Sequence, residues 1–192
     1  KFANVPFTGE ISGKKTGGFK KGKKYGEWLS YDENGQLETG RFKAGKRHGE
    51  WLFYNENGQL WLSQSYKNGI LNGLQNRYNG NGIEYSDNYQ NGKLEGVSKS
   101  FYNNGKLLSE GHYKTGKQDG TFRNYYDNGQ MRWEGNFSQG TTHGLWEQYY
   151  ENGRLKYIGN YKDGNEDGLW EYFNEDGSLK KTETYKDGEL LD

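Results

Sequence analysis

The stretch GLWEQYYENGRLKYIGNY, residues 144–161, is one copy of a unit that recurs along almost the whole chain of 192 residues. It combines an aromatic pair, an Asn-Gly dipeptide and a second group of aromatic residues at alternate positions. An aromatic residue opens each copy at intervals of 23 or 24 residues: Phe19, Phe42, Tyr66, Tyr89, Tyr113, Phe137, Tyr161 and Tyr185. A fixed period of this length predicts a stack of repeated structural units, in which each copy is buried mainly by its neighbours.

Two turn signals divide each copy into two strands. One of them is Asn-Gly or Asp-Gly at a fixed position, eight and nine residues after the glycine that precedes the aromatic pair: Asn34-Gly35, Asn57-Gly58, Asn81-Gly82, Asn104-Gly105, Asn128-Gly129, Asn152-Gly153 and Asp176-Gly177. A glycine three residues after each opening aromatic marks the second turn, as Gly140 does after Phe137. These residues favour tight turns because they tolerate left-handed backbone conformations. Between the turns, Met131, Trp133 and Gly135 alternate as in a half-buried strand. The sequence therefore predicts an all-β fold of tandem β-hairpins, each of about 23–24 residues.

Glycine and aromatic residues decide what kind of core this fold can have. The chain has 31 glycines, while only 30% of its residues are hydrophobic, and aromatic residues alone make up 17%. We expect a thin ladder of rings that cover strands bared by glycine and leave their N–H or O–H groups at the solvated rim. The first and third repeats are one residue short after Asn-Gly, so we expect a bulge or register change there.

Charge and cysteine content exclude several classes of protein. The formal net charge is zero and there is no cysteine, so neither disulfides nor a thiolate metal site is available. No run of apolar residues is long enough to span a membrane. The chain has one basic cluster and no broader basic stripe, so we expect no nucleic-acid binding and do not favour membrane-lipid binding. The cluster consists of Lys14, Lys15, Lys20, Lys21, Lys23 and Lys24. The chain begins with Lys1, which suggests a mature or trimmed form, either cytoplasmic or exported with its signal removed.

The pattern G-x-W-x-x-Y-x-x-N-G-x-L, seen at Gly26–Leu37 and again at Gly144–Leu155, resembles the MORN repeat variant of bacterial proteins. Chains of this kind are often labelled antitoxins of the YwqK family. The resemblance implies successive hairpins in one elongated, twisted antiparallel sheet. It also implies a binding or assembly surface rather than an enzyme, with a protein partner that could be a toxin. A phospholipid-associated function, known for other MORN proteins, is a further alternative, but the chain has no kinase signature.

The resemblance covers residues 7–192, and we expect residues 1–192 to form a single array. It would consist of a short hairpin at 7–18, seven repeats at 19–184 and a partial repeat at 185–192.

Departures from the repeat suggest candidate binding residues. The tryptophan position becomes Gln75 and Ser98 in the two middle repeats, which indicates either tolerated drift or a recessed groove between aromatic walls. Counted back from Tyr66, Trp61 has the opposite parity to the core residues, so we expect it to be exposed, either as a partner contact or as an isolated surface aromatic. The aromatic pairs that contain Tyr126 and Tyr150 complete the candidate set.

Catalysis and cofactors find little support in the sequence. The histidines His48 and His143 lie four repeats apart, roughly 38 Å at about 4.8 Å per strand, so they cannot share an active site. The Asn/Asp-Gly turns offer one side-chain oxygen each, too few for calcium. We expect no enzyme activity, no cofactor and no metal. The remaining alternative is binding of cell-wall glycan or choline, since aromatic hairpins can form cages for quaternary ammonium groups or stack on sugars.

Overall fold

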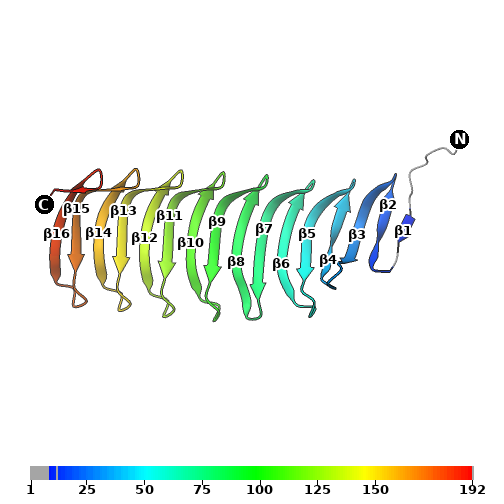
Figure 1. Cartoon of the computed structure of the whole chain (residues 1–192), viewed down its shortest axis with the longest axis horizontal. Helices are drawn as coiled ribbons and strands as arrows, with labels where there is room; N and C mark the ends of the chain where they lie inside the picture. Colours follow the sequence, from blue (N-terminus) through cyan, green and yellow to red (C-terminus); the bar gives the residue numbers. More distant parts are fainter. Residues whose placement is uncertain (1–8, 12, 192) are drawn as a thin grey trace. The chain divides into compact units, whose positions relative to one another are not determined.

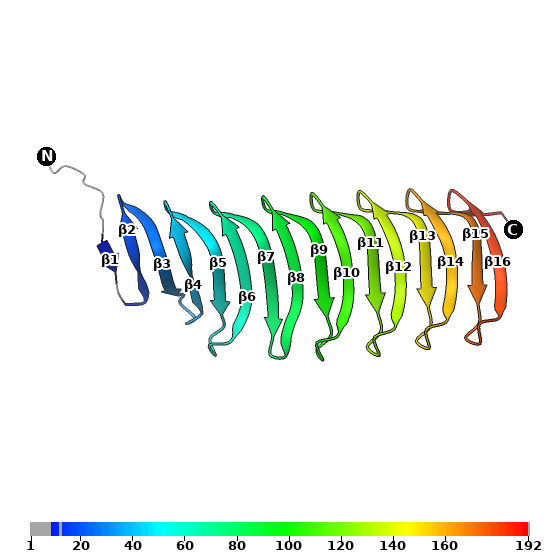
Figure 2. The same ribbon diagram turned by 180° about the vertical axis from the view of Figure 1, so that it is seen from behind.

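The computed structural model describes residues 9–11 and 13–191, and the chain divides into two compact units, Lys1–Lys93 and Leu94–Asp192. We call these the N-terminal unit and the C-terminal unit. The described residues form strands and turns and contain no helix, so both faces of the ribbon are uncovered by helices in Figures 1 and 2. In particular, this part of the chain contains no apolar helix of membrane-spanning length. The predicted all-β class with tandem antiparallel hairpins is confirmed in each unit.

The N-terminal unit pairs its strands in chain order, each antiparallel to the next. Its strands are β1 (Gly9–Ile11), β2 (Lys15–Lys20), β3 (Lys23–Tyr31), β4 (Leu37–Lys43), β5 (Lys46–Tyr54), β6 (Leu60–Lys67), β7 (Ile70–Asn79) and β8 (Gly82–Gln90). The first predicted hairpin begins at Phe7, which lies outside the described residues.

The C-terminal unit follows the same plan. Its strands are β9 (Lys93–Phe101), β10 (Leu107–Lys114), β11 (Lys117–Tyr125), β12 (Met131–Ser138), β13 (Thr141–Tyr149), β14 (Leu155–Lys162), β15 (Asn165–Phe173), β16 (Leu179–Lys186) and β17 (Glu189–Leu190). The proposed single array over residues 1–192 stays a prediction.

The two turn signals form two different turns. Between β12 and β13, Gln139 and Gly140 both have positive φ, 52° and 92°, inside the closing pair Ser138 and Thr141. This is the two-residue hairpin turn whose twist matches that of paired strands. In the five-residue Asn-Gly loops that join the strands at the other edge, only the glycine is left-handed: Gly129 has φ of 91°, and its N–H donates to the Tyr126 carbonyl at 2.8 Å. These loops are therefore longer turns closed by a glycine bulge.

The predicted ladder of rings on glycine is confirmed. Trp51 is 1% exposed and Trp170 is 2% exposed, although nothing but a single layer of strands supports them. A Cβ atom added at Gly40 would lie 2.4 Å from the Trp51 ring, and one at Gly159 would lie 2.1 Å from the Trp170 ring. Glycine is thus required in the neighbouring strand because the ring occupies the space of a side chain. Within each unit, we call the side of the strands that carries these rings the tryptophan face of that unit.

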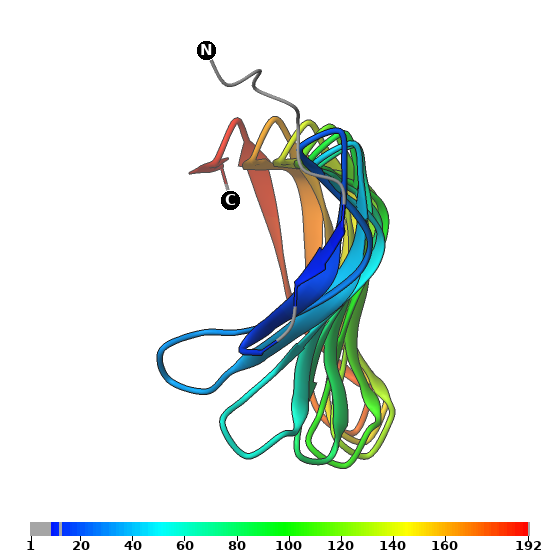
Figure 3. The same ribbon diagram turned by 90° about the vertical axis from the view of Figure 1, so that its right-hand side faces the viewer.

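The register change predicted for the two short repeats is absent from the first and present in the third, and the 24-residue repeats have it as well. In 24-residue repeats, the strand after the Asn-Gly loop carries one extra residue, such as Trp61 between the pairs Tyr54–Leu60 and Phe53–Leu62. The short first repeat has no register shift between β3 and β4. The short third repeat keeps a shift but joins β7 to β8 through a two-residue turn inside the pair Asn79–Gly82. A missing residue therefore removes a bulge or shortens a turn. It does not add a bulge. Figure 3 shows that the strands bend along their length.

Candidate functional site

The row of buried rings ends inside the N-terminal unit. Along the tryptophan face, the cross-strand neighbours from β5 to β8 are Trp51, Gln64, Gln75 and Asp87. Gln64 and Asp87 stand where glycine lies under a ring elsewhere, and Gln75 stands where the ring would be. Gln64 Nε2 donates to Gln75 Oε1 at 2.6 Å, and the Tyr66 hydroxyl donates to Gln64 Oε1 at 2.6 Å. The ring and the glycines that accommodate it are lost together. Gln64, Gln75 and Asp87 replace them, and we call these three side chains the polar floor.

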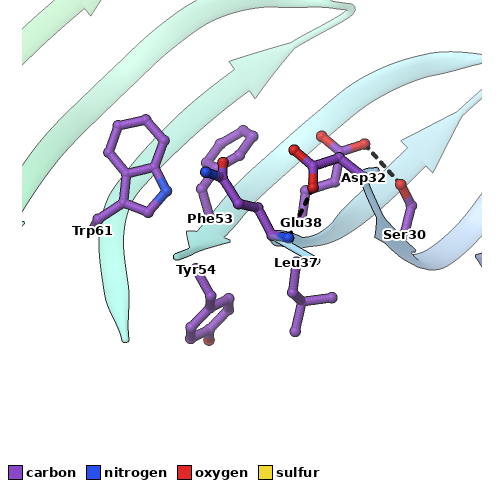
Figure 4. A pocket seen from close by; sticks show the side chains of 8 residues that line it. Ser30, Asp32, Leu37, Glu38, Phe53, Tyr54 and Trp61 are labelled. Atoms are coloured by element: carbon purple, nitrogen blue, oxygen red, sulfur yellow. Dashed lines mark hydrogen bonds between the residues drawn. The ribbon is translucent and has the colours of Figure 1, made fainter. Parts of the chain in front are cut away.

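Trp61 lies beside this polar floor. The bulge in β6 shifts the register by one residue, and the Trp61 ring centroid lies 6.3 Å from that of Phe53, which is 6.4 Å from that of Trp51. Figure 4 shows Trp61 and Phe53 on one side of the strands, with Tyr54 and Leu37 on the other. The expectation that Trp61 points away from the core face is therefore wrong, because the parity count did not allow for the bulge. Its predicted exposure is confirmed, at 37%.

Three surface depressions meet at the Trp61 side chain. The first, of about 240 Å³, lies between Trp61 and Phe53 on one side and Asp32 and Glu38 on the other (Figure 4). The second, of about 290 Å³, borders the loop at Asn55. The third, of about 340 Å³, contains the polar floor, and its lining residues are Trp61, Leu62, Gln64, Gln75, Arg77, Tyr85 and Asp87. Trp61 thus lines both the first depression, which is aromatic and acidic, and the third depression, which is more polar.

Ion pairs hold the charged side chains of this surface in place. The Arg47 guanidinium donates to Glu38 and lies 4.3 Å from the Trp51 ring centroid and 5.3 Å from that of Phe53. Arg77 pairs with Glu84 at 3.2 Å. These contacts combine a cation, a carboxylate and a ring, which favours a fixed orientation of each side chain.

Tyr89, which lies next to the polar floor, has a shifted pKa. Burial, and then the negative charge of Asp87, raises the pKa of Tyr89 above its ordinary value. A hydrogen bond between the phenol and Gln75 acts in the opposite direction, but it is the weakest of the three causes and the pKa of Tyr89 stays raised. The floor is therefore a hydrogen-bonded network rather than a set of independent polar groups.

Exposed aromatic residues are concentrated in the N-terminal unit. Among the described residues, the aromatic side chains with large exposure are Tyr25, Tyr31, Trp61 and Tyr85, at 45%, 41%, 37% and 39%. The large exposed hydrophobic residues of the C-terminal unit are all leucines, as at Leu145. Trp61 and Tyr85 line the same depression, so two exposed rings lie at one polar floor.

The candidate residues from the sequence are divided between the two units. Trp61 and Gln75 line one depression. Ser98 belongs to the C-terminal unit, where it lies opposite Gly111. The hydroxyls of Tyr126 and Tyr150 donate to the carbonyls of Tyr149 and Phe173, each at 2.8 Å, so these side chains link successive repeats. Their role as partner contacts stays a prediction.

The ionisable residues considered for catalysis do not gather. His48 and His143 belong to different units, and His143 Nδ1 lies 3.8 Å from Asp163 in an exposed pair. Within residues 9–11 and 13–191, no three histidine or acidic side chains come together as metal ligands. The expectations of no metal and no enzyme activity remain predictions.

Several residues of the site were missed by the sequence analysis: Phe53, Arg77, Tyr85, Asp32 and Glu38. A usable signal was present for the floor, because Gln64 and Asp87 replace the glycine found at Gly40, Gly111 and Gly135 in the same repeat position. The remaining residues are brought to Trp61 only by strand pairing and the bulge.

Comparison with protein families agrees with this geometry. The MORN repeat variant model matches residues 24–43, 47–68, 94–115, 118–139, 142–163 and 166–187, more than half of the chain. The chain therefore belongs to the MORN repeat variant family. No curated protein matches it. Residues 69–93, which contain β7 and β8, lie between two matched segments, and they supply Gln75, Arg77, Tyr85 and Asp87 to the site.

Proposed function

We propose that this MORN repeat scaffold is not an enzyme and binds a protein partner through the tryptophan face of its N-terminal unit, with Trp61 as the central contact. The observation that carries the proposal is the coincidence of three features. The departure from the repeat pattern, the exposed rings and the adjoining depressions all occur around Trp61. Large aromatic residues that stand next to pockets are the residues that most often dominate protein interfaces.

The chemistry of the surface is suited to a protein partner. Trp61 and Phe53 offer apolar area, whereas Asp32, Arg77 and the glutamine floor offer acceptors and donors. Interfaces commonly combine an apolar centre with a polar rim of this kind. Neutralisation of a toxin, as the resemblance to antitoxin-labelled chains implies, is the form of partner binding that we propose first.

The test is site-specific photo-crosslinking in cells that express the protein natively. A photoreactive phenylalanine analogue at position 61 should give one discrete protein adduct. The matched control is the same analogue at Lys156, which occupies the equivalent bulge in β14. Adduct formation should be lost when excess unlabelled wild-type protein competes and should persist when excess Trp61→Ala protein is added. Equal adducts at both positions would contradict the proposal.

A second candidate function is binding of a quaternary ammonium group or a cell-wall glycan. The depression that Trp61 and Phe53 line also carries the Asp32 carboxylate, a combination that suits a cation near aromatic rings. Choline or muropeptides added to the wild-type protein should then raise its melting temperature in a dose-dependent way, and Trp61→Ala should abolish the rise. No shift with either ligand would remove this candidate.

A further inference from the structure

The five-residue Asn-Gly loops differ in what holds the asparagine side chain. In the C-terminal unit, both ends of the amide are engaged. Asn128 Oδ1 accepts the N–H of Gln130 at 2.8 Å, and its Nδ2 donates to the Glu151 carbonyl in the next repeat at 2.9 Å. Asn152 makes the same two bonds, to Arg154 and to Glu175, at 3.0 and 3.2 Å. Asn104 accepts from Lys106 and donates to the Asp127 carboxylate.

The corresponding loops of the N-terminal unit close in a different way. Asp32 Oδ1 accepts the N–H groups of Asn34 and Gln36, and Asn55 Oδ1 does the same for Asn57 and Gln59. The side-chain amides of Asn34 and Asn57 have no hydrogen-bond partner among the described residues and lie exposed. Nothing of the following repeat holds them.

We propose that Asn34 and Asn57 are sites of spontaneous deamidation, and that the bonds to the next repeat protect Asn104, Asn128 and Asn152 from it. In this reaction the backbone nitrogen of the following glycine attacks the asparagine Cγ and loses its proton. The bond from Cγ to the amide nitrogen breaks, ammonia leaves, and a cyclic succinimide forms. Water then opens the ring at either carbonyl to give aspartate or isoaspartate. The net change is amide plus water to carboxylic acid plus ammonia, without any oxidant or cofactor.

The attacking group is the same in all five loops, so it does not distinguish them. Each asparagine is followed by glycine, and each glycine N–H donates within its own loop: 3.2 Å at Gly35, 2.9 Å at Gly58, 2.8 Å at Gly105, 2.8 Å at Gly129 and 2.9 Å at Gly153. All five asparagines are exposed to water. The difference lies in the electrophile, because Cγ can approach the glycine nitrogen only when the side chain rotates. In the C-terminal unit that rotation breaks two hydrogen bonds.

The modification would alter the surface around Trp61. The loop that contains Asn34 contributes Asp32 and Gln36 to one depression, and the loop that contains Asn57 contributes Asn55 and Gln59 to another. Deamidation would place a new negative charge in each loop, and isoaspartate would lengthen the backbone there. The fraction of deamidated molecules would increase with time, and the surface at the edge of the site would change with it, whichever ligand the site binds.

The test compares the five rates within one sample. Folded wild-type protein is incubated at mildly alkaline pH, and peptide mapping by mass spectrometry measures conversion at each asparagine. The same protein in concentrated urea gives the intrinsic rates. Relative to those rates, Asn34 and Asn57 should convert at least about tenfold faster than Asn128 and Asn152 in the folded protein. Equal relative rates at Asn57 and Asn128 would overturn the proposal.

Two loop variants separate the specific bond from general loop mobility. Asp127→Ala removes the side-chain acceptor of the Asn104 amide and should raise conversion at Asn104 severalfold, with Asn152 unchanged. Glu56→Ala changes the equivalent loop position opposite Asn34, where no such bond exists, and should leave Asn34 unchanged. If Asp127→Ala leaves the rate of conversion at Asn104 unchanged, the hydrogen bond to the next repeat does not protect Asn104 from deamidation, and the proposal is wrong.

Discussion

The loops at one edge of the two units show two ways to close the same repeat. In the N-terminal unit, the residue after the strand-ending aromatic is Asp32 or Asn55, and its side chain caps its own loop. In the first three loops of the C-terminal unit, the same position is Tyr102, Tyr126 or Tyr150, and its hydroxyl donates to a carbonyl of the next repeat at 2.7–2.8 Å. The last loop has Asn174 there, and its amide donates to Ser178 within the same loop. The first arrangement closes each loop with bonds inside the same repeat, and the second joins the loop to the following repeat.

This difference coincides with where the exposed aromatic residues lie. The C-terminal unit uses its tyrosines between repeats, and from Phe122 onward it keeps a row of rings on glycine, as at Trp146 over Gly135 and Trp170 over Gly159. The N-terminal unit closes its loops locally, and its row of rings gives way to Gln64 and Gln75. Binding surfaces are commonly built where a scaffold departs from its own repeat, because neighbouring repeats still supply the support.

Loss of a buried ring should have the largest effect in either unit. Trp51→Ala and Trp170→Ala should each lower the free energy of unfolding by about 3–5 kcal/mol, because each leaves a cavity over glycine. Hydrogen exchange measured by mass spectrometry should show lost protection mainly in the unit that carries the change, since repeats are stabilised by near neighbours. Equal loss of protection in both units would show that they unfold together and would contradict the view that each unit is stabilised mainly by its own repeats.

A smaller loss is expected when a left-handed glycine is replaced. Gly58→Val and Gly129→Val should each cost about 1–2 kcal/mol, because a β-branched residue is strained at φ of 73° or 91°. The loss should be greater at Gly129, where Tyr126 and Asn128 tie the loop to the next repeat and limit relaxation. Urea denaturation measures both. An unchanged midpoint at Gly129→Val would show that this turn does not need glycine.

The bond between repeats can be removed without loss of volume. Tyr126→Phe should cost about 1 kcal/mol, the usual net value of one hydrogen bond. Hydrogen exchange should then increase around Tyr149 in the following repeat as well as in the loop itself. Asp32→Ala, the matched change in the N-terminal unit, should increase exchange only in its own loop. Effects of both variants confined to one loop would remove the proposed distinction between local and linking closure.

The smallest expected effect concerns alkaline pH. Burial, and then the charge of Glu147, raises the pKa of Tyr149 from its ordinary value of 10.0 to about 12. Since the folded pKa is the higher one, the neutral phenol stabilises the fold below pH 10, and this contribution is lost as the pH rises towards 12. Tyr149→Phe should make stability less dependent on pH in that range and remove one late phenolate from an absorbance titration. An unchanged titration would contradict the assignment.

This pH effect also differs between the two units. Among the described tyrosines with a raised pKa, Tyr89 is in the N-terminal unit, and the others are in the C-terminal unit: Tyr125, Tyr149, Tyr157, Tyr161 and Tyr172. The C-terminal unit should therefore be the first to lose stability above pH 10.

Much of the architecture could be predicted because it depends on local backbone geometry. Glycines at fixed spacing mark both turns, and alternation marks the strands. The pairing of a ring with glycine, as for Trp51 and Gly40, also follows from residue size alone. The candidate site was predicted less well: Gln75 and Trp61 were identified, but Trp61 was assigned to the wrong face. A single bulge residue reverses side-chain parity, and its position depends on how two strands pair.

The sequence by itself determined the period, the all-β hairpins and the thin aromatic core, since each follows from residue types at short, regular spacing. Only the tertiary structure decided that Trp61 lies beside Phe53 and Gln75, and that Asn128 is held while Asn57 is not. These outcomes depend on atoms that are brought together from different repeats. Hydrogen-bond partners 23 residues apart, such as Tyr126 and Tyr149, become neighbours only when successive strands are in register.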